Sequence, residues 1–478
     1  MKFLFLYPTT DTFSLERGEK SFLYAPPLGP LYLASILMEN GHEVKVLDTR
    51  GEENAGDKIR RALNSVDAVG ITIPTFALDN SERIVKIVKE MQPDMPVIAG
   101  GPHPTLYPHA SMTEMNIDML CLGEGENSIL DMVAILEGRK NAEEGRGVYY
   151  RKNGEVKKGR EPEVIKNIDA IPFPAHELVE RYDYGYSYGF KLFEGKTTAI
   201  LTSRGCPRKC TFCSRRLLSM GSYRIRSAEN VVDEIEMLYE RGYKNIILAD
   251  DNFMSNLKRV NKIMDMILDR GIDITMFVNG ARVDSADEAT YKKMWKAGVR
   301  MISFGLESGN QEILDFYRKE IILEQIRKAV QLSHKTGFFT IGNFIIGAPV
   351  EREEHIRKTI DFACSLPLDM AEFFILRYMP GSQLWEEAVA DGKISEDEYM
   401  VESDSERGLG NFTREELLHW KNLAYKRFYL RPSYVAGEVF KFLSRMDIRL
   451  LNAGFSLLKI LLYRTEKDEE VWKSVEQH

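Results

Sequence analysis

The sequence contains few cysteines and histidines, and it lacks a long hydrophobic segment. Only five of its 478 residues are cysteine and eight are histidine. No stretch reaches the roughly eighteen uninterrupted apolar residues typical of a membrane-spanning helix, so we predict none. The apolar run Lys2–Tyr7 is cut short by Pro8 and predicts a buried strand instead of a signal peptide. These absences argue against secreted disulfide scaffolds and integral membrane proteins.

Basic residues are not in excess either. The 64 lysines and arginines are outnumbered by 72 aspartates and glutamates, which gives a formal net charge of −8 at pH 7. This balance offers no electrostatic basis for binding nucleic acid, and we predict no nucleic-acid partner. Apolar residues make up 44% of the chain, enough for well-packed cores, and the length predicts two or three domains.

The cysteines that are present are concentrated in one segment. Cys206, Cys210 and Cys213 form a C-x3-C-x2-C pattern within eight positions. Thiolates suit iron–sulfur clusters, and three of them can hold three irons of a [4Fe–4S] cube, leaving the fourth open to a small molecule. A structural zinc site needs a fourth cysteine or histidine, and the nearest histidines, His176 and His334, are distant in sequence. The pattern therefore favours the open cluster over zinc or a disulfide.

With the aromatic Phe212 before the third cysteine, this segment resembles the signature of the radical S-adenosylmethionine (SAM) superfamily. The resemblance implies that the open iron chelates SAM. It also implies that an electron from the reduced cluster cleaves SAM to methionine and a 5′-deoxyadenosyl radical. The cluster requires an electron donor such as flavodoxin or ferredoxin and a reducing compartment, which predicts a cytoplasmic enzyme. The three cysteines then serve as both metal ligands and catalytic residues.

Residues 1–140 alternate strand and helix patterns. We predict strands and helices at Lys2–Tyr7, Leu28–Asn40, Val44–Leu47, Ala68–Ile73, Ser81–Met91, Val97–Ala99, Met119–Leu122 and Asn127–Leu136. Such alternation predicts a doubly wound, Rossmann-like parallel sheet with ligands at the carboxyl ends of its strands. The residues at those ends are Thr72, Gly100, Gly101, His103, Gly123, Glu124, Gly125 and Glu126.

This first domain resembles the cobalamin-binding domain found ahead of many radical SAM domains. The resemblance rests on Pro26–Ala34, on Gly41–Asp48 and on the later glycine turns, and it implies that the residues at the strand ends contact cobalamin. The cobalt-ligating Asp-x-His-x-x-Gly motif of other cobalamin proteins is absent, because no histidine has an aspartate two positions before it. The resemblance thus implies cobalamin held without a histidine ligand. A domain that keeps the fold without the cofactor is the alternative.

Residues 141–195 have weaker periodicity and are interpreted as a connector. Val148–Val156 predicts a hairpin with a turn at Asn153 and Gly154. The tyrosine-rich stretch Tyr182–Tyr188 predicts a packed loop.

Six strand-then-helix units follow in residues 196–385. The predicted strands are Ala199–Ser203, Asn245–Ala249, Ile274–Val278, Arg300–Phe304, Thr340–Ile346 and Glu372–Leu376. Such units predict a parallel barrel, and six of them predict an open (β/α)6 barrel, as the resemblance also implies. In parallel barrels chemistry gathers at the carboxyl ends of the strands, and the cysteine pattern follows the first strand.

Other polar and glycine residues follow the later strands. The candidate SAM contacts are Asp250, Asp251, Asn279, Arg282, Glu307, Gly347 and Glu351. The resemblance implies that groups after the second strand contact the SAM amino group and that the Gly347–Glu351 turn lies near the adenine. Each residue alone is equally compatible with a turn or a helix cap, but together they recur after successive strands.

Residues 386–478 predict helices without the strand-and-helix rhythm. Within them, Ile448–Tyr463 has one apolar and one polar face. We predict that this amphipathic helix packs on the barrel, and a peripheral contact with a membrane surface is the alternative.

Residues 1–385 therefore resemble cobalamin-dependent radical SAM enzymes, whose commonest reaction is C-methylation of an unactivated carbon. One alternative is radical cyclisation, ring contraction or carbon–carbon coupling without methyl transfer. Another is a sensor or carrier without turnover. The sequence does not choose among a small-molecule, lipid or peptide substrate.

Overall fold

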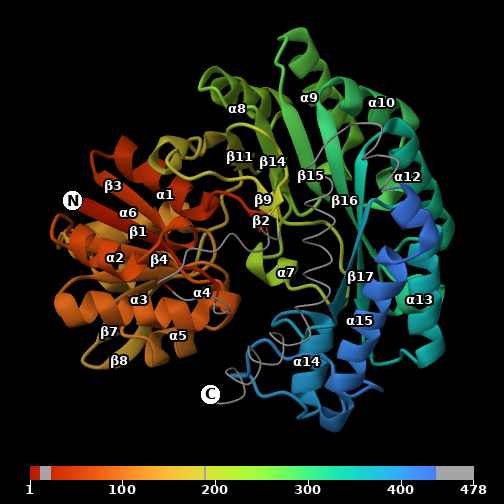
Figure 1. Ribbon diagram of the computed structural model, residues 1–478. Helices are drawn as coiled ribbons and strands as arrows, with labels where there is room; N and C mark the ends of the chain where they lie inside the picture. The colour runs from red at the N-terminus through yellow and green to blue at the C-terminus, as the bar shows by residue number, and fades with distance from the viewer. Residues whose placement is uncertain (11–14, 16–22, 188–189, 438–478) are drawn as a thin grey trace.

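The computed structural model describes residues 1–10, 15, 23–187 and 190–437. The amphipathic segment Ile448–Tyr463 lies outside these residues. Two α/β units lie side by side, with the short helix α7 (Arg215–Leu218) between them (Figure 1). The first is formed by the N-terminal part of the chain and the second by the strands of the barrel.

The first unit is built on a seven-stranded sheet. Its strands, in spatial order, are β3 (Glu43–Asp48), β1 (Lys2–Tyr7), β4 (Ala68–Thr72), β5 (Val97–Gly100), β6 (Met119–Cys121), β7 (Val148–Lys152) and β8 (Glu155–Lys158). The first five are parallel, as predicted, and the last two are antiparallel. The predicted hairpin is therefore confirmed, with positive φ at Asn153 and Gly154, and it extends the first sheet.

Successive side chains of a strand point to opposite faces of the sheet. Because apolar side chains lie on both faces, helices cover both of them. On β1, Phe3 and Phe5 enter one core and Leu4 and Leu6 enter the other. The helices α1 (Leu28–Glu39) and α6 (Gly125–Leu136) cover the first face, and α2 (Ala55–Leu63) and α3 (Leu78–Met91) cover the second. The short helices α4 (Pro102–Leu106) and α5 (Pro108–Glu114) follow β5.

The second unit is a six-stranded parallel barrel with its strands in chain order. They are β11 (Thr197–Ile200), β14 (Asn245–Leu248), β15 (Thr275–Ala281), β16 (Val299–Glu307), β17 (Phe339–Ile346) and β18 (Met370–Ile375). The surrounding helices are α8 (Ala228–Glu240), α9 (Leu257–Asp269), α10 (Glu288–Lys296), α11 (Gln311–Phe316), α12 (Leu323–Thr336) and α13 (Glu353–Ser365). Within the described residues no ladder joins β18 to β11, which agrees with the predicted open barrel.

The last described helix, α15 (Arg414–Tyr429), packs along β18, the last strand of the barrel, whereas α14 (Gln383–Ala390) lies near the cysteine segment (Figure 1). The Tyr429 hydroxyl accepts from the backbone N–H of Ala371 at 3.1 Å and donates to its carbonyl at 3.0 Å. The Tyr425 hydroxyl accepts from the N–H of Phe373 at 3.2 Å. Tyrosine hydroxyls of α15 thus form hydrogen bonds with backbone groups of the edge strand β18.

A small antiparallel sheet fastens the connector to the first unit. Its strands are β2 (Leu23–Tyr24), β9 (Tyr186–Ser187) and β10 (Phe190–Lys191). Beside it the hydroxyl of Tyr184 donates to Asp48 Oδ2 at 3.0 Å, and Asp48 is fully buried. Residues 182–185 therefore form a packed loop, as predicted, whereas Tyr186 and Ser187 belong to strand β9, which we did not predict.

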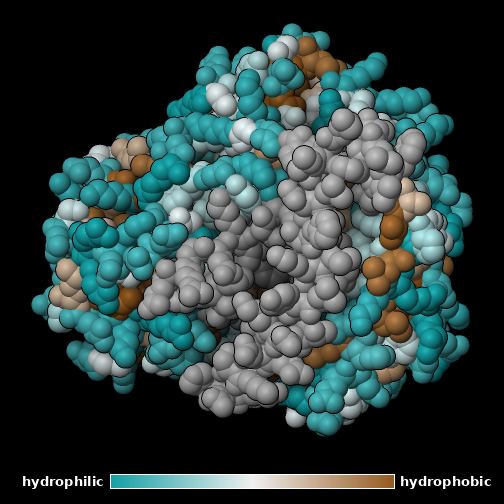
Figure 2. All heavy atoms as spheres, in the orientation of Figure 1, coloured by the Kyte–Doolittle hydropathy of each residue, from teal (hydrophilic) through white to brown (hydrophobic). Residues whose placement is uncertain are grey.

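Hydrophilic residues cover most of the visible described surface, with hydrophobic residues scattered singly or in small groups among them (Figure 2). Among the described helices, none has the length and apolar character that crossing a bilayer requires.

Candidate functional site

The cysteine segment lies just after the first barrel strand, at the end of the barrel where parallel strands present their carboxyl ends. It is enclosed by a two-stranded antiparallel ribbon formed by β12 (Ser203–Arg204) and β13 (Arg224–Ile225). We call residues 205–223, between these strands, the cysteine loop. Its backbone is fixed to the barrel, because Thr211 N–H donates to Tyr317 O and Leu384 N–H donates to Thr211 O, both at 3.0 Å.

The aromatic residue of the motif, Phe212, also anchors the loop. Its ring meets the ring of Tyr317 edge-on, with centroids 4.9 Å apart and planes at 70°. Tyr317 is fully buried, so Phe212 packs on a fixed surface. Phe212 therefore holds the peptide between Cys210 and Cys213 in place.

A buried ion pair lies close to Cys210. Lys319 Nζ is 2.5 Å from Glu307 Oε1, and each residue is 7% exposed. Burial raises the pKa of the Cys210 thiol, and the positive charge of Lys319 opposes that rise. Arg282 donates to the Lys319 carbonyl at 2.7 Å. The predicted residues Glu307 and Arg282 thus share one charged cluster beside the cysteine loop.

The two aspartates after β14 have protein partners. Asp250 is buried, and its carboxylate accepts hydrogen bonds from Thr202 N–H at 3.1 Å and from the hydroxyls of Thr202 and Ser203. Burial raises the pKa of Asp250, and these hydrogen bonds oppose the rise. Asp251 pairs with Arg215 at 3.0 Å. Both carboxylates hold the chain on either side of the cysteines, and a contact with SAM stays a prediction.

Glu351 holds the turn after β17. Its Oε2 accepts from the N–H groups of Gly347 at 2.5 Å and Ala348 at 3.2 Å. Gly347 has a φ of +95°, and a Cβ there would lie 3.0 Å from Leu417. A larger residue would strain this turn, which explains the glycine. Asn279 is half-buried within β15, which extends further than predicted. Proximity of these residues to SAM stays a prediction.

Glu351 should make the stability of the protein depend on pH. Burial raises the pKa of Glu351 from 4.5 to about 7, against the opposing hydrogen bonds. The folded state therefore retains a proton that the unfolded state loses above pH 4.5, and stability falls as the pH rises through 7. Between pH 4.5 and pH 8, the free energy of unfolding of Glu351→Gln should rise by about 3 kcal/mol relative to that of the wild type. Urea unfolding of both apoproteins across this range measures the gain, and a pH-independent difference would contradict the assignment.

The other predicted cofactor contacts lie at the carboxyl ends of β4 and β5. Gly101 has a φ of +103°, and a Cβ there would meet Thr72 Cγ2 at 2.9 Å. His103 is fully buried between Tyr107 and Tyr399, with ring centroids at 5.1 and 4.8 Å. Burial lowers the pKa of His103 to about 4.

These strand ends fit a polar cofactor. The described residues offer no hydrogen-bond partner to either ring nitrogen of His103, and a buried polar group without one is costly. The glycine turn before it is closely packed, because a Cβ on Gly101 would also lie 3.2 Å from Ile73 N. An unpaired imidazole and a glycine turn at the strand ends of a doubly wound sheet match the place where such sheets bind ligands.

The two carboxylates of the Gly123–Glu126 turn lie beside arginines of the barrel. Glu124 accepts from Arg204 at 2.8 Å and from Arg224 at 2.7 Å, and Glu126 also pairs with Arg204. Burial would raise the pKa of Glu124, but the hydrogen bonds from the arginines outweigh it and lower that pKa. Opposite charges thus draw both carboxylates to the barrel, and a contact of this turn with cobalamin stays a prediction.

Three residues of this region escaped the sequence analysis. Lys319, Arg204 and Arg224 act through partners between 12 and 100 positions away. Only Arg204 carried a local signal, since it stands two residues before Cys206.

The donor set of the cysteine loop fits a [4Fe–4S] cluster. Three thiols lie on one anchored loop, and the cation of Lys319 is near enough to influence Cys210. Among the described residues, no three histidine, cysteine or acidic side chains converge closely enough to hold a single metal ion. The residues that would hold the cluster are Cys206, Cys210 and Cys213.

Comparison with known families agrees with this geometry. Residues 200–363 match the family model of the radical SAM superfamily, and residues 18–133 match that of the B12 binding domain. The chain belongs to the radical SAM superfamily, among the members that carry a B12-binding domain. The cofactors of this class are a [4Fe–4S] cluster, SAM and cobalamin, and its members are enzymes.

Several known proteins are similar to most of this chain. An uncharacterized methyltransferase of Pyrococcus horikoshii is 34% identical over 92% of this chain and 95% of its own length. The anaerobic magnesium-protoporphyrin IX monomethyl ester cyclase of Rubrivivax gelatinosus is 29% identical over 91% of this chain and 78% of its own. The structure of the radical SAM methyltransferase TsrM from Kitasatospora setae, with cobalamin and a [4Fe–4S] cluster bound, has a TM-score of 0.67 at 20% identity. The structural match covers 82% of this chain and 75% of the TsrM chain.

Proposed function

We propose that this enzyme is a cobalamin-dependent C-methyltransferase acting on an unactivated carbon. The observation that carries the proposal is the contact between the cysteine loop and the strand ends of the first domain. A Cβ placed on Gly123, after β6, would lie 2.8 Å from the sulfur of Met220 in the cysteine loop. The two cofactor sites thus belong to adjoining surfaces, as transfer of a methyl group to an activated carbon requires.

The proposed reaction consumes two molecules of SAM. When bound, the cluster supplies the electron that cleaves one SAM, and cobalamin carries the methyl group taken from the other. The products are the methylated substrate, methionine, 5′-deoxyadenosine holding the hydrogen removed from the substrate, and S-adenosylhomocysteine. A flavodoxin or ferredoxin supplies the two electrons that balance the reaction.

The roles of the chain's own residues follow from their positions. Cys206, Cys210 and Cys213 hold the cluster, while Phe212 keeps the intervening peptide rigid. Thr72, Gly100, Gly101 and His103 lie at the strand ends that would receive cobalamin. Asp250 fixes the segment between β11 and the cysteine loop. Asn279, Arg282, Glu307 and the Gly347–Glu351 turn surround SAM in this proposal.

Isotope labelling tests the proposal directly. The anaerobically reconstituted protein, with cobalamin and a reductant, should be incubated with SAM carrying a deuterated methyl group and with a metabolite and lipid extract. We expect a new product that contains the deuterated methyl group, together with 5′-deoxyadenosine, and mass spectrometry detects both.

Other outcomes would redirect the assignment. A changed product without deuterium, formed together with 5′-deoxyadenosine, would replace methylation by a cyclisation or coupling reaction. The relative from Rubrivivax gelatinosus, named a cyclase, makes this the second candidate. The absence of both a changed product and 5′-deoxyadenosine would favour a sensor or carrier.

The substrate class and location belong to the same proposal. We favour a small molecule, with a lipid or peptide as alternatives that the extract experiment separates, and a reducing cytoplasmic compartment. Packing of residues 448–463 on the barrel stays a prediction, with a peripheral membrane contact as its alternative.

A further inference from the structure

Four charged side chains connect the first domain to the base of the cysteine loop. Arg204 Nη1 donates to Glu124 Oε1 at 2.8 Å, and its Nη2 donates to Glu126. Arg224 Nη1 donates to Glu124 Oε2 at 2.7 Å. The side chains of these four residues are 8–16% exposed. We call this set the arginine–glutamate bridge. It is mostly withdrawn from water, where charge-assisted hydrogen bonds are strong.

The bridge compensates a repulsion built into the ribbon. Arg204 and Arg224 are direct cross-strand partners of β12 and β13. Like charges at such positions destabilise a two-stranded ribbon, which is marginal by itself. The carboxylate of Glu124 lies between the two guanidinium groups, and together with Glu126 it balances their two positive charges. The ribbon that begins and ends the cysteine loop therefore depends on a residue of the other domain.

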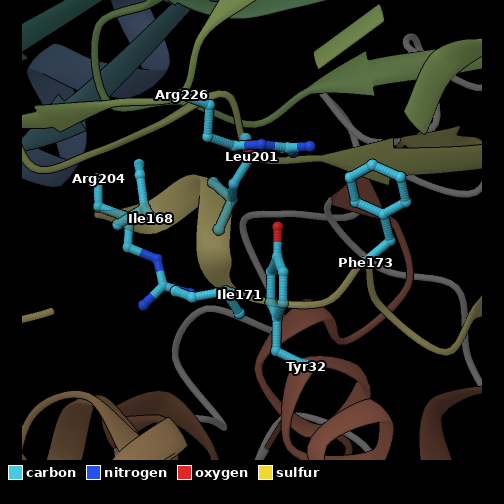
Figure 3. A pocket seen from close by; sticks show the side chains of 7 residues that line it. All are labelled: Tyr32, Ile168, Ile171, Phe173, Leu201, Arg204 and Arg226. Atoms are coloured by element: carbon cyan, nitrogen blue, oxygen red, sulfur yellow. Dashed lines mark hydrogen bonds between the residues drawn. The ribbon is translucent and has the colours of Figure 1, made fainter. Parts of the chain in front are cut away.

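The surroundings of the bridge are tightly packed. Tyr32 of α1 lies under the guanidinium of Arg204, with the Arg204 carbon 5.2 Å from the ring centroid. Beside it is a cavity of only about 10 Å³. Its lining comes from α1, the connector and the barrel: Tyr32, Ile168, Ile171, Phe173, Leu201, Arg204 and Arg226 (Figure 3). A change at the bridge is thus transmitted to the cysteine loop, because little space exists to absorb it.

The backbone also ties the bridge to the connector. Ile165 N–H donates to Glu124 Oε2 at 3.0 Å, and Arg224 Nη1 donates to the Ile165 carbonyl at 2.7 Å. Glu124 therefore accepts from three parts of the chain at once: the connector and both strands of the ribbon.

We infer that Glu124, Glu126, Arg204 and Arg224 are positioning residues that set where the cysteine loop lies relative to the B12-binding domain. They act through the ribbon and touch no reacting atom. The inference deepens the proposed function, on which its cobalamin part rests. Its first consequence, the order of the cysteine loop, does not depend on the reaction.

The test uses the full chain, reconstituted anaerobically with cluster and cobalamin. Glu124→Gln combined with Glu126→Gln removes both charges and nearly preserves shape. Backbone amide exchange in residues 203–225, followed by mass spectrometry, should become faster by on the order of tenfold or more, since the ribbon opens locally. Pulsed electron paramagnetic resonance should show a broader distribution of distances between cob(II)alamin and the reduced cluster.

Asp131→Asn is the matched control. Asp131 lies on α6, is 5% exposed and accepts from Lys140 at 2.6 Å and Arg146 at 2.8 Å, all within the first domain. Its loss should speed exchange near residues 131–146 and leave residues 203–225 and the distance distribution unchanged. This control separates positioning from a general loss of stability in the first domain.

Unchanged exchange in residues 203–225 of the double variant would overturn the inference. Should that variant fail to fold, Glu126→Gln alone, which leaves Glu124 between both arginines, is measured in the same way. A protein that retains no cobalamin would contradict the proposed function, and the exchange measurement would still decide the inference.

Discussion

Cys210→Ala should reduce the formation of 5′-deoxyadenosine from SAM by more than about a hundredfold, the upper end of the loss when a residue supporting a metal ligand is removed. The reason is that alanine offers no thiolate to one of the three irons held by the loop. The measurement is 5′-deoxyadenosine produced by the reconstituted protein with SAM and dithionite. Iron content and the absorption of the cluster should fall with it.

Cys364→Ala is the control for this variant. Cys364 is a free, half-buried cysteine of α13, outside the cysteine loop. Its replacement should leave the cluster and the cleavage of SAM unchanged. Cleavage at the wild-type rate by Cys210→Ala would remove the cluster assignment and with it the proposed function.

Glu234→Leu should destabilise the barrel by about 3–5 kcal/mol, the usual cost of removing one partner of a buried ion pair. Glu234 lies on α8 with no exposed surface, and it pairs with Arg226, which is 4% exposed. His176 of the connector also lies 3.5 Å from its second oxygen. The substitution leaves the guanidinium buried without a counter-ion. A lower midpoint of thermal unfolding measures the effect.

Glu229→Leu on the same helix provides the comparison. Glu229 and Lys262 form an ion pair whose side chains are 53% and 56% exposed. An exposed pair of this kind contributes at most about 1 kcal/mol. Equal losses of stability in the two variants would show that burial does not decide the value of the Arg226–Glu234 pair.

The fold followed from local patterns wherever the pattern was regular. The strand Lys2–Tyr7 was predicted with the bounds that the structure gives, because its apolar run ends at Pro8. The helix α2 was missed, although its buried residues Ala55, Ile59 and Leu63 recur at every fourth position. Its many charged residues concealed this weak stripe.

Long-range pairing was beyond the reach of these patterns. Nothing near Val148 indicates that β7 joins β6 of the first sheet, because a strand pattern specifies a buried face and not a neighbour. The glycines of Gly123–Glu126 were recognised as a turn, but the partners of its glutamates lie about 80 to 100 residues further on. The end of the barrel that carries the cysteine loop could be predicted, since parallel strands in chain order bring their carboxyl ends together.

The sheet that joins β2 to β9 has a consequence for synthesis on the ribosome. Leu23 pairs with Ser187, so the first strand of this sheet leaves the ribosome long before its partner. At about 5–20 residues per second, some ten to thirty seconds separate the two. During that interval the nascent first domain can form its parallel strands, but β2 stays unpaired. The small sheet can therefore form only when synthesis has reached β9, shortly before the first strand of the barrel. The order of translation thus makes completion of the first domain coincide with the start of barrel synthesis.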